Sequence, residues 1–223
     1  HLFIVLAPVM LSPLPACAQQ PFFTDDANVT AKGKLHFEFT NEFDILKRSS
    51  FPTLKQNTSS FTLNYGLFDR VEIGISSPLI AIFNARGTSP RIAFGVGDTS
   101  LSIKYNFRDE RDGSRLPAMA VSFDLELPTG DKDRQLGSAL VDYQLNGIVQ
   151  KSLTERTKLR LNSGVLFSGN TLKGAIGIKR RGTVFTGGAS LVRQFTRKLD
   201  LGAEVTGAVT EEFQLGKGQL QFQ

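Results

Sequence analysis

Residues 118–151, AMAVSFDLELPTGDKDRQLGSALVDYQLNGIVQK, contain two alternating segments joined by a polar link. Every second residue is apolar from Met119 to Leu127, and the same alternation runs, apart from Gly147, from Val141 to Val149. Alternation with a period of two gives a strand one apolar face and one polar face, so these residues predict a β-hairpin. The polar face could contact bulk water around a soluble protein, or water inside a barrel whose outer face contacts lipid.

The first 18 residues have the features of an export signal. Residues 2–11 form an apolar run, and Ala16-Cys17-Ala18 resembles a cleavage site before Gln19. Because the chain starts at His1, without a methionine or a basic segment, we expect it to be truncated at the front. Cys17 is the single cysteine. We therefore expect a mature chain without disulfides, without a thiolate metal site and without a cofactor.

The bulk composition fits one exported all-β domain. The 223 residues are 40% hydrophobic, which can form one core, and no later segment approaches the roughly 18 apolar residues of a spanning helix. The net charge is +5, but the basic residues fall in turns and loops. A nucleic-acid interface would collect them on one face, so we expect no nucleic-acid partner.

Similar strands fill the rest of the chain, beginning with an alternating segment at residues 35–45. Short charged turns centred near Phe68, Arg111, Thr154 and Thr196 recur about every 43 residues, with longer polar loops between them. Two long strands per repeat favour an outer-membrane barrel over a propeller, whose blades have four short strands. We interpret residues 83–98 as a long glycine-rich loop.

These patterns predict a signal peptide at residues 1–18 and a periplasmic lead-in at 19–33. Residues 34–223 should form an antiparallel up-and-down transmembrane β-barrel, incomplete at its C-terminus. About ten strands can be traced, and we expect twelve in the parent protein because bacterial barrels have even strand numbers.

The apolar faces carry aromatic residues near strand ends, as interfacial girdles do, although the chain has no tryptophan. The opposite faces are small and polar, which fits a wet lumen. A soluble ligand-binding barrel, the alternative, would have an apolar cavity and a polar outer face. Apolar outer faces in water would promote aggregation, so we favour the membrane barrel. The girdle candidates are Tyr65, Tyr105, Phe107, Phe185 and Phe195.

Five motifs follow one another in a familiar order: GVGDTSL (95–101), KYNF (104–107), LPTGD (127–131), LGS (136–138) and VDY (141–143). In this order they resemble the outer-membrane barrel family labelled as transporters of the meta-pathway of phenol degradation. The resemblance covers residues 21–223. It implies a bacterial outer-membrane channel for small solutes, including aromatic ones. A closing strand that ends in an aromatic residue is missing, which we interpret as truncation at the back.

Charged residues on the predicted inner face are the candidate functional residues. An acidic lumen would favour cations, and Asp124, Glu126 and Asp142 are the best candidates for a constriction. Alternatively, these groups pair with one another, with Lys104 and Arg160 as the basic partners, in a closed structural or adhesive barrel. The complete candidate set is Glu38, Glu42, Asp44, Glu72, Lys104, Asp124, Glu126, Asp142, Arg160 and Glu204.

The expected partners are outer-membrane lipid, lipopolysaccharide and a small solute. Lipopolysaccharide phosphates could contact Lys173, Lys179, Arg180 and Arg181 in a predicted external loop, although this loop could equally be simply solvated. We predict no enzyme activity. Asp124 and Glu126 are paired carboxylates, but His36 is the only histidine after the signal and no serine has a nucleophile-like setting.

Overall fold

The computed structural model describes residues 23–45, 55–83, 92–111, 113–168, 182–196, 199–210 and 214–222, and every regular element in these ranges is a β-strand. None of the described residues forms a helix long and apolar enough to cross a membrane. The strands are β1 (Leu35–Ile45), β2 (Lys55–Phe68), β3 (Val71–Phe83), β4 (Ile92–Val96), β5 (Thr99–Arg108), β6 (Ala118–Leu127), β7 (Asp142–Thr154), β8 (Thr157–Ser168), β9 (Gly182–Thr196), β10 (Leu199–Thr210) and β11 (Gln214–Phe222).

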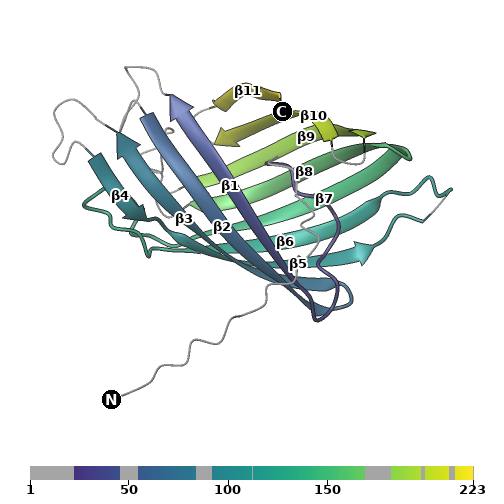
Figure 1. Ribbon diagram of the computed structural model, residues 1–223, viewed down its shortest axis with the longest axis horizontal. Helices are drawn as coiled ribbons and strands as arrows, with labels where there is room; N and C mark the ends of the chain where they lie inside the picture. Colours follow the sequence, from purple (N-terminus) through teal and green to yellow (C-terminus); the bar gives the residue numbers. More distant parts are fainter. Residues whose placement is uncertain are drawn as a thin grey trace, which may run out of the picture.

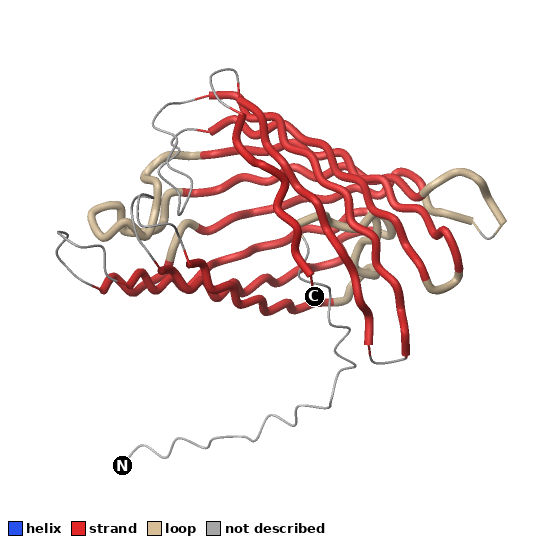
Figure 2. The backbone as a smooth tube through the Cα atoms, turned by 90° about the horizontal axis from the view of Figure 1, so that it is seen from above, coloured by secondary structure: helices blue, strands red, loops and turns tan. Residues whose placement is uncertain are grey.

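The strands form one antiparallel sheet in which neighbours in space follow one another in sequence. Its order is β1-β2-β3-β5-β6-β7-β8-β9-β10-β11, with β4 beside β3. The sheet curls into a half-barrel, as the ribbon and the tube viewed from above both show (Figures 1 and 2). The prediction of an antiparallel up-and-down barrel fold of about ten strands is therefore confirmed.

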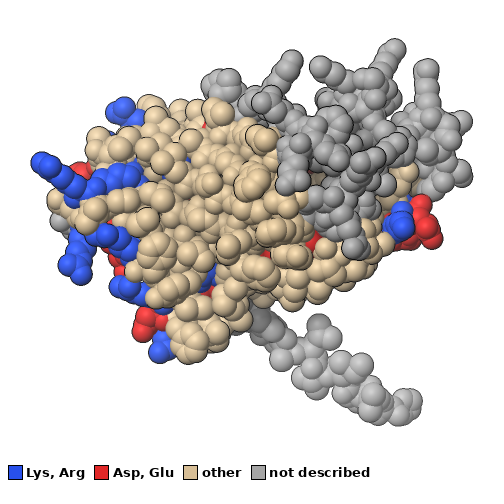
Figure 3. Space-filling view, turned by 180° about the vertical axis from the view of Figure 1, so that it is seen from behind, with Lys and Arg blue, Asp and Glu red and all other residues tan. Residues whose placement is uncertain are grey.

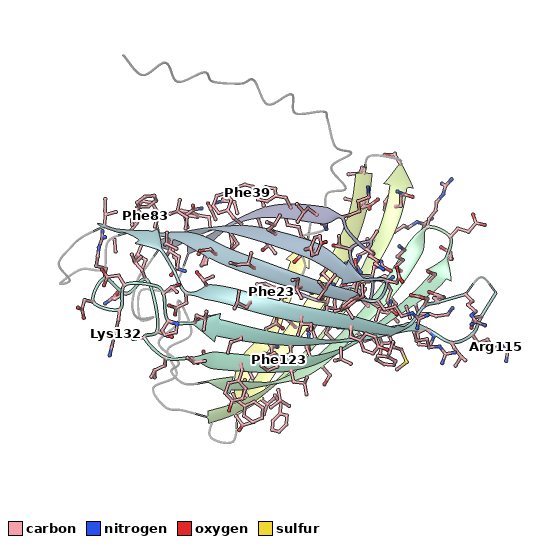
Figure 4. All side chains as sticks on the ribbon, turned by 90° about the horizontal axis from the view of Figure 1, so that it is seen from below. Phe23, Phe39, Phe83, Arg115, Phe123 and Lys132 are labelled. Carbon is pink, nitrogen blue, oxygen red and sulfur yellow. The ribbon has the colours of Figure 1, made fainter. Side chains whose placement is uncertain are left out.

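The two ends of the sheet differ in their connections. Residues 69–70 and 155–156 connect strands at one end, where β5 also ends and β6 begins, and we call it the short-turn end. The loop at residues 128–141 lies at the other end, which we call the long-loop end. Figure 4 shows Arg115 and Lys132 at these opposite ends. Among the connections that the structure fully describes, short turns at one end and a longer loop at the other agree with the predicted alternation.

The structure corrects the prediction of an uninterrupted loop at residues 83–98. Ile92–Val96 forms β4, which pairs with the last five residues of β3, from Leu79 to Phe83. The first part of β3 pairs instead with β5, in register from Val71↔Tyr105 to Ser76↔Ser100. Because both strands pair with β3, β4 and β5 are two parts of one broken strand, interrupted at Gly97 and Asp98. The glycines of this segment concealed its alternation.

Burial along the strands is inverted relative to a soluble protein. Phe37 on β1 is 60% exposed, whereas Glu204 on β10 is 1% exposed. Outward aromatic side chains contact one another across strands, with ring centroids 5.2 Å apart for Phe39 and Phe61 and 5.1 Å apart for Tyr143 and Phe167. On the convex face, charged side chains gather at the short-turn end and the wide area beside them carries few (Figure 3). The inner faces therefore hold the polar groups.

Candidate functional site

The residues before β1 cross the concave face of the sheet. Residues 23–34, which we call the strap, contact β10, β9, β8, β5, β3 and β2, and Figure 1 shows them in dark purple, turning back across the strands. A segment that touches both β3 and β10 must lie inside the curl, because these strands are six steps apart in the sheet. The strap is the organising element of the inner face.

The start of the strap is bound by an acidic residue of β10. The Glu204 carboxylate accepts hydrogen bonds from the backbone N–H groups of Phe23 at 2.9 Å and Thr24 at 2.5 Å. The Thr24 hydroxyl donates to Ser190 of β9 at 2.6 Å. The Thr24 methyl group fills the space that a side chain at position 188 would need, because a Cβ built on Gly188 would lie 2.7 Å from it. These hydrogen bonds offset the cost of burying a carboxylate away from water.

Two adjacent strap aspartates meet Lys104 and Arg160, the two basic residues that are buried in the described part of the sheet. The Lys104 ammonium donates to both carboxylate oxygens of Asp25 at 3.2 Å. Lys104 also lies 3.7 Å from Glu72, its cross-strand neighbour in the ladder. The Arg160 guanidinium lies 3.4 Å from the carboxylate of Asp26. Because each cation holds a strap carboxylate, the ion pairs connect the strap to β5 and β8 at once.

Apolar contacts add to the ion pairs at the middle of the strap. Ala27 is completely buried in a small cluster on the inner faces of β6 and β7, and its carbonyl accepts a hydrogen bond from the Asn106 amide at 2.8 Å. The other members of the cluster are Ala118, Ala120 and Ile148. Small residues at positions 118 and 120 leave room for the strap backbone to approach the sheet closely.

The end of the strap is fixed by Glu72 and Gly66. The Glu72 carboxylate accepts hydrogen bonds from the backbone N–H and the hydroxyl of Thr30, at 2.6 and 2.5 Å. Gly66 forms a parallel bridge with Lys32, and a Cβ at position 66 would lie 2.3 Å from the carbonyl oxygen of Ala31. Gly33, with a φ of 73°, then turns the chain into β1.

The structure brings four of the predicted inner-face residues to the strap: Glu72, Lys104, Arg160 and Glu204. Asp142 is also buried, and Asp124 and Glu126 are half-buried farther toward the long-loop end. Glu126 and Asp142 are direct partners across the β6–β7 ladder. Asp124, Glu126 and Asp142 thus share one patch of the inner face, as predicted for a constriction, and that role stays a prediction.

The remaining predicted residues are more scattered. Glu38 of β1 is half-buried and its carboxylate lies 3.6 Å from the His36 ring, whereas Glu42 is exposed. The side chain of Asp44 lies outside the described residues. The basic loop proposed to contact lipopolysaccharide, with Lys173, Lys179, Arg180 and Arg181, also lies outside the described residues, as does the predicted signal peptide.

Sequence reasoning missed the strap. The sequence predicted Lys104 and Arg160 as the internal basic residues, with acidic partners on the strands. Two of the acidic partners, Asp25 and Asp26, come instead from the lead-in, which has no periodicity to reveal its position. The available indication was the adjacent pair of acidic residues just ahead of a barrel whose inner face carries two basic residues.

Among the described residues, no group of three or more His, Cys, Asp and Glu side chains is arranged to hold a metal ion. Several buried polar side chains of the strands instead bind the strap: Glu72, Lys104, Asn106, Arg160, Ser190 and Glu204. Most of these contacts are charge-assisted hydrogen bonds.

A curled antiparallel sheet with apolar side chains outside and a polar, strap-bound interior defines a β-barrel class of protein. The family described as "Putative MetA-pathway of phenol degradation" matches residues 18–219, and the chain belongs to this family. Its description names a degradation pathway and no enzyme activity. No curated protein sequence matches the chain significantly.

Proposed function

We propose that the protein is a bacterial outer-membrane channel through which small solutes, including aromatic compounds, diffuse passively. The inverted burial of the strands carries this proposal. Removing a fully exposed large apolar side chain from water gains about 1.5–3 kcal/mol, and the outward faces present many such side chains that are about half exposed. A lipid environment removes the cost of exposing them, and transmembrane barrels show this alternation of apolar exterior and polar interior.

The family description supports aromatic solutes as the cargo, because it links the family to phenol degradation. The interior supports diffusion over chemistry, since its described charges are held by one another and by backbone N–H groups. Five acidic side chains, against Lys104 and Arg160, are buried among the described residues, so the lumen should favour cations over anions. The five acids are Asp26, Glu72, Asp98, Asp142 and Glu204.

Planar-bilayer recording of the refolded full-length protein tests the channel. We expect discrete conductance steps with a larger permeability for potassium than for chloride. Protein from the same preparation that has not refolded, identified by its unshifted migration on a gel without heating, is the control. Refolded protein that never conducts contradicts the proposal.

A closed structural barrel is the second candidate, and the strap favours it because its contacts occupy the inner face near the short-turn end. Replacing Glu126 and Asp142 with alanine separates the two functions. A closed barrel predicts lower stability and unchanged solute uptake, because these carboxylates would serve only packing. A channel predicts weaker cation selectivity, because they would line the path of the solute.

A further inference from the structure

The loop between β6 and β7 folds onto the inner face of the sheet. We call residues 128–141 the rim loop. Its Leu136 is buried against Ile82 of β3 and Ala93 of β4, which are opposite each other in the ladder. Ile82 lies an even number of residues after the inward Glu72 on the same strand, so this contact is on the inner wall. The rim loop therefore covers the wall at the long-loop end.

The carboxylate of Asp98 holds both ends of the rim loop. One oxygen accepts a hydrogen bond from the Gly130 N–H at 2.9 Å, and the other accepts one from the Ser138 N–H at 2.6 Å. Asp98 is 7% exposed and Ser138 is 1% exposed, so water competes little for these bonds. The Thr129 hydroxyl adds bonds to the Gly97 carbonyl at 3.1 Å and the Thr99 hydroxyl at 3.0 Å.

Close backbone contacts fix the shape of the loop. A Cβ at Gly137 would lie 2.5 Å from the Asp98 carboxylate, and a Cβ at Gly130 would lie 2.8 Å from the Gly137 Cα. Neither position admits a larger residue without movement of the backbone. Gln135 and Ala139 adopt φ values of 64° and 58°, which side chains rarely accept, so the surrounding contacts determine the backbone here.

The rim loop also explains why three separate sequence motifs occur together. GVGDTSL (95–101) contributes Gly97, Asp98 and Thr99, LPTGD (127–131) contributes Thr129 and Gly130, and LGS (136–138) contributes the rest. These motifs lie at the break between β4 and β5 and in the rim loop that docks on it. Together, the residues of these motifs hold the rim loop against the inner wall.

We infer that the rim loop is a fixed constriction at the long-loop end, and that Asp98 is the positioning residue that sets its aperture. This inference rests on the proposed channel function. A barrel closed from a sheet of this size has a small cross-section, so one loop on its inner wall removes a large share of the passage. Asp98 touches no solute and acts through the backbone of the rim loop.

Three variants of the full-length protein test the inference: Asp98→Ala removes both bonds, Asp98→Asn retains one acceptor oxygen, and Leu136→Ser removes the apolar contact alone. Asp69→Asn, an exposed turn residue at the short-turn end, is the matched charge control. Each refolded variant is measured for single-channel conductance and for the largest neutral sugar that swells protein-containing liposomes. These readouts report the aperture and do not follow from a change in stability alone.

We expect Asp98→Ala and Leu136→Ser to raise conductance about twofold or more and to admit larger sugars, because narrow constrictions dominate pore resistance. The conductance of Asp98→Asn should lie between those of these variants and the wild type, and the conductance of Asp69→Asn should equal that of the wild type.

If the wild type conducts but Asp98→Ala and Leu136→Ser have the same conductance and sugar limit as the wild type, the inference is overturned and the channel proposal stands. A silent wild type overturns the proposed function, and the inference with it. If Asp98→Ala does not refold, Leu136→Ser decides the question.

Discussion

The guanidinium of Arg160 lies 3.4 Å from the carboxylate of Asp26, which precedes it by 134 residues, and both side chains are almost entirely buried. The Nε atom of Arg160 is buried without a hydrogen-bond partner in the described structure. The Asp26 carboxylate therefore offsets much of the free energy that it costs to bury the guanidinium charge. The pair therefore connects the strap to the far side of the curled sheet. Its strength can be measured.

Removing Asp26 should destabilise the protein more than removing the whole pair. Asp26→Ala leaves a buried guanidinium without this carboxylate, which costs about 3–5 kcal/mol, whereas the double variant with Arg160→Met should recover most of the loss. Urea unfolding of the refolded protein in detergent micelles measures each free energy. Additive effects of the two substitutions would show that the residues are not coupled.

Enlarging Gly66 should displace the end of the strap. Gly66→Ala places a Cβ 2.3 Å from the Ala31 carbonyl oxygen, and the rigid backbone leaves it no room. We expect faster protease cleavage within residues 23–34 and a higher conductance. Gly207→Ala is the control, because a Cβ at that strand position meets nothing within 4 Å. Equal cleavage of the two variants would show that the strap does not depend on the close contact at Gly66.

A charge on the outer face should prevent insertion into a bilayer. Phe123 points outward at the middle of β6 (Figure 4), and Phe123→Arg should cost about 2–4 kcal/mol in lipid. The inward Gln144→Arg, on the neighbouring strand, should cost much less in lipid because its charge faces the wet interior. Folding into liposomes, followed by gel migration, measures both. An equal effect of the two arginines would contradict a lipid-facing exterior.

Acid should weaken the short-turn end. Partial burial disfavours ionised Glu110, but hydrogen bonds from Lys151 and the Ser152 N–H outweigh it and lower the pKa of this carboxyl. A lowered pKa in the folded state gives stability that is present above the unfolded value of about 4.5 and is lost as the pH falls below it. Glu110→Gln should lose this acid dependence. Unfolding midpoints between pH 3 and pH 7 compare the two proteins, and parallel curves would contradict the role of Glu110.

The strands could be predicted because the alternation of apolar and polar residues is a local pattern, which can be recognised in the sequence without knowing the fold. The hairpin of β6 and β7, the inward Glu204 and the outward Phe123 all follow from parity alone. At β9, where glycine and alanine blur the pattern, the predicted girdle residue Phe185 is exposed, as expected for an outward side chain.

The strap and the docked position of the rim loop could not be predicted because they depend on distant partners. Asp25 and Asp26 carry no periodicity, and only Lys104 and Arg160 define their place. The rim loop contains glycines that in a sequence indicate only an ordinary turn, and the carboxylate that holds it, Asp98, lies about 30 residues or more away. The inner wall is also less uniformly polar than expected, since Ile82 faces Leu136 there.

The hydrogen bond from Thr24 to Glu204 joins residues 180 positions apart, and it lies inside the curl. The first described residues must therefore be in place while the last strands arrive, so the sheet wraps around its own beginning. Contacts of such separation slow folding, because a long loop must close before they contribute. The protein should consequently fold slowly, because the docking of β10 onto the strap closes a loop of this length.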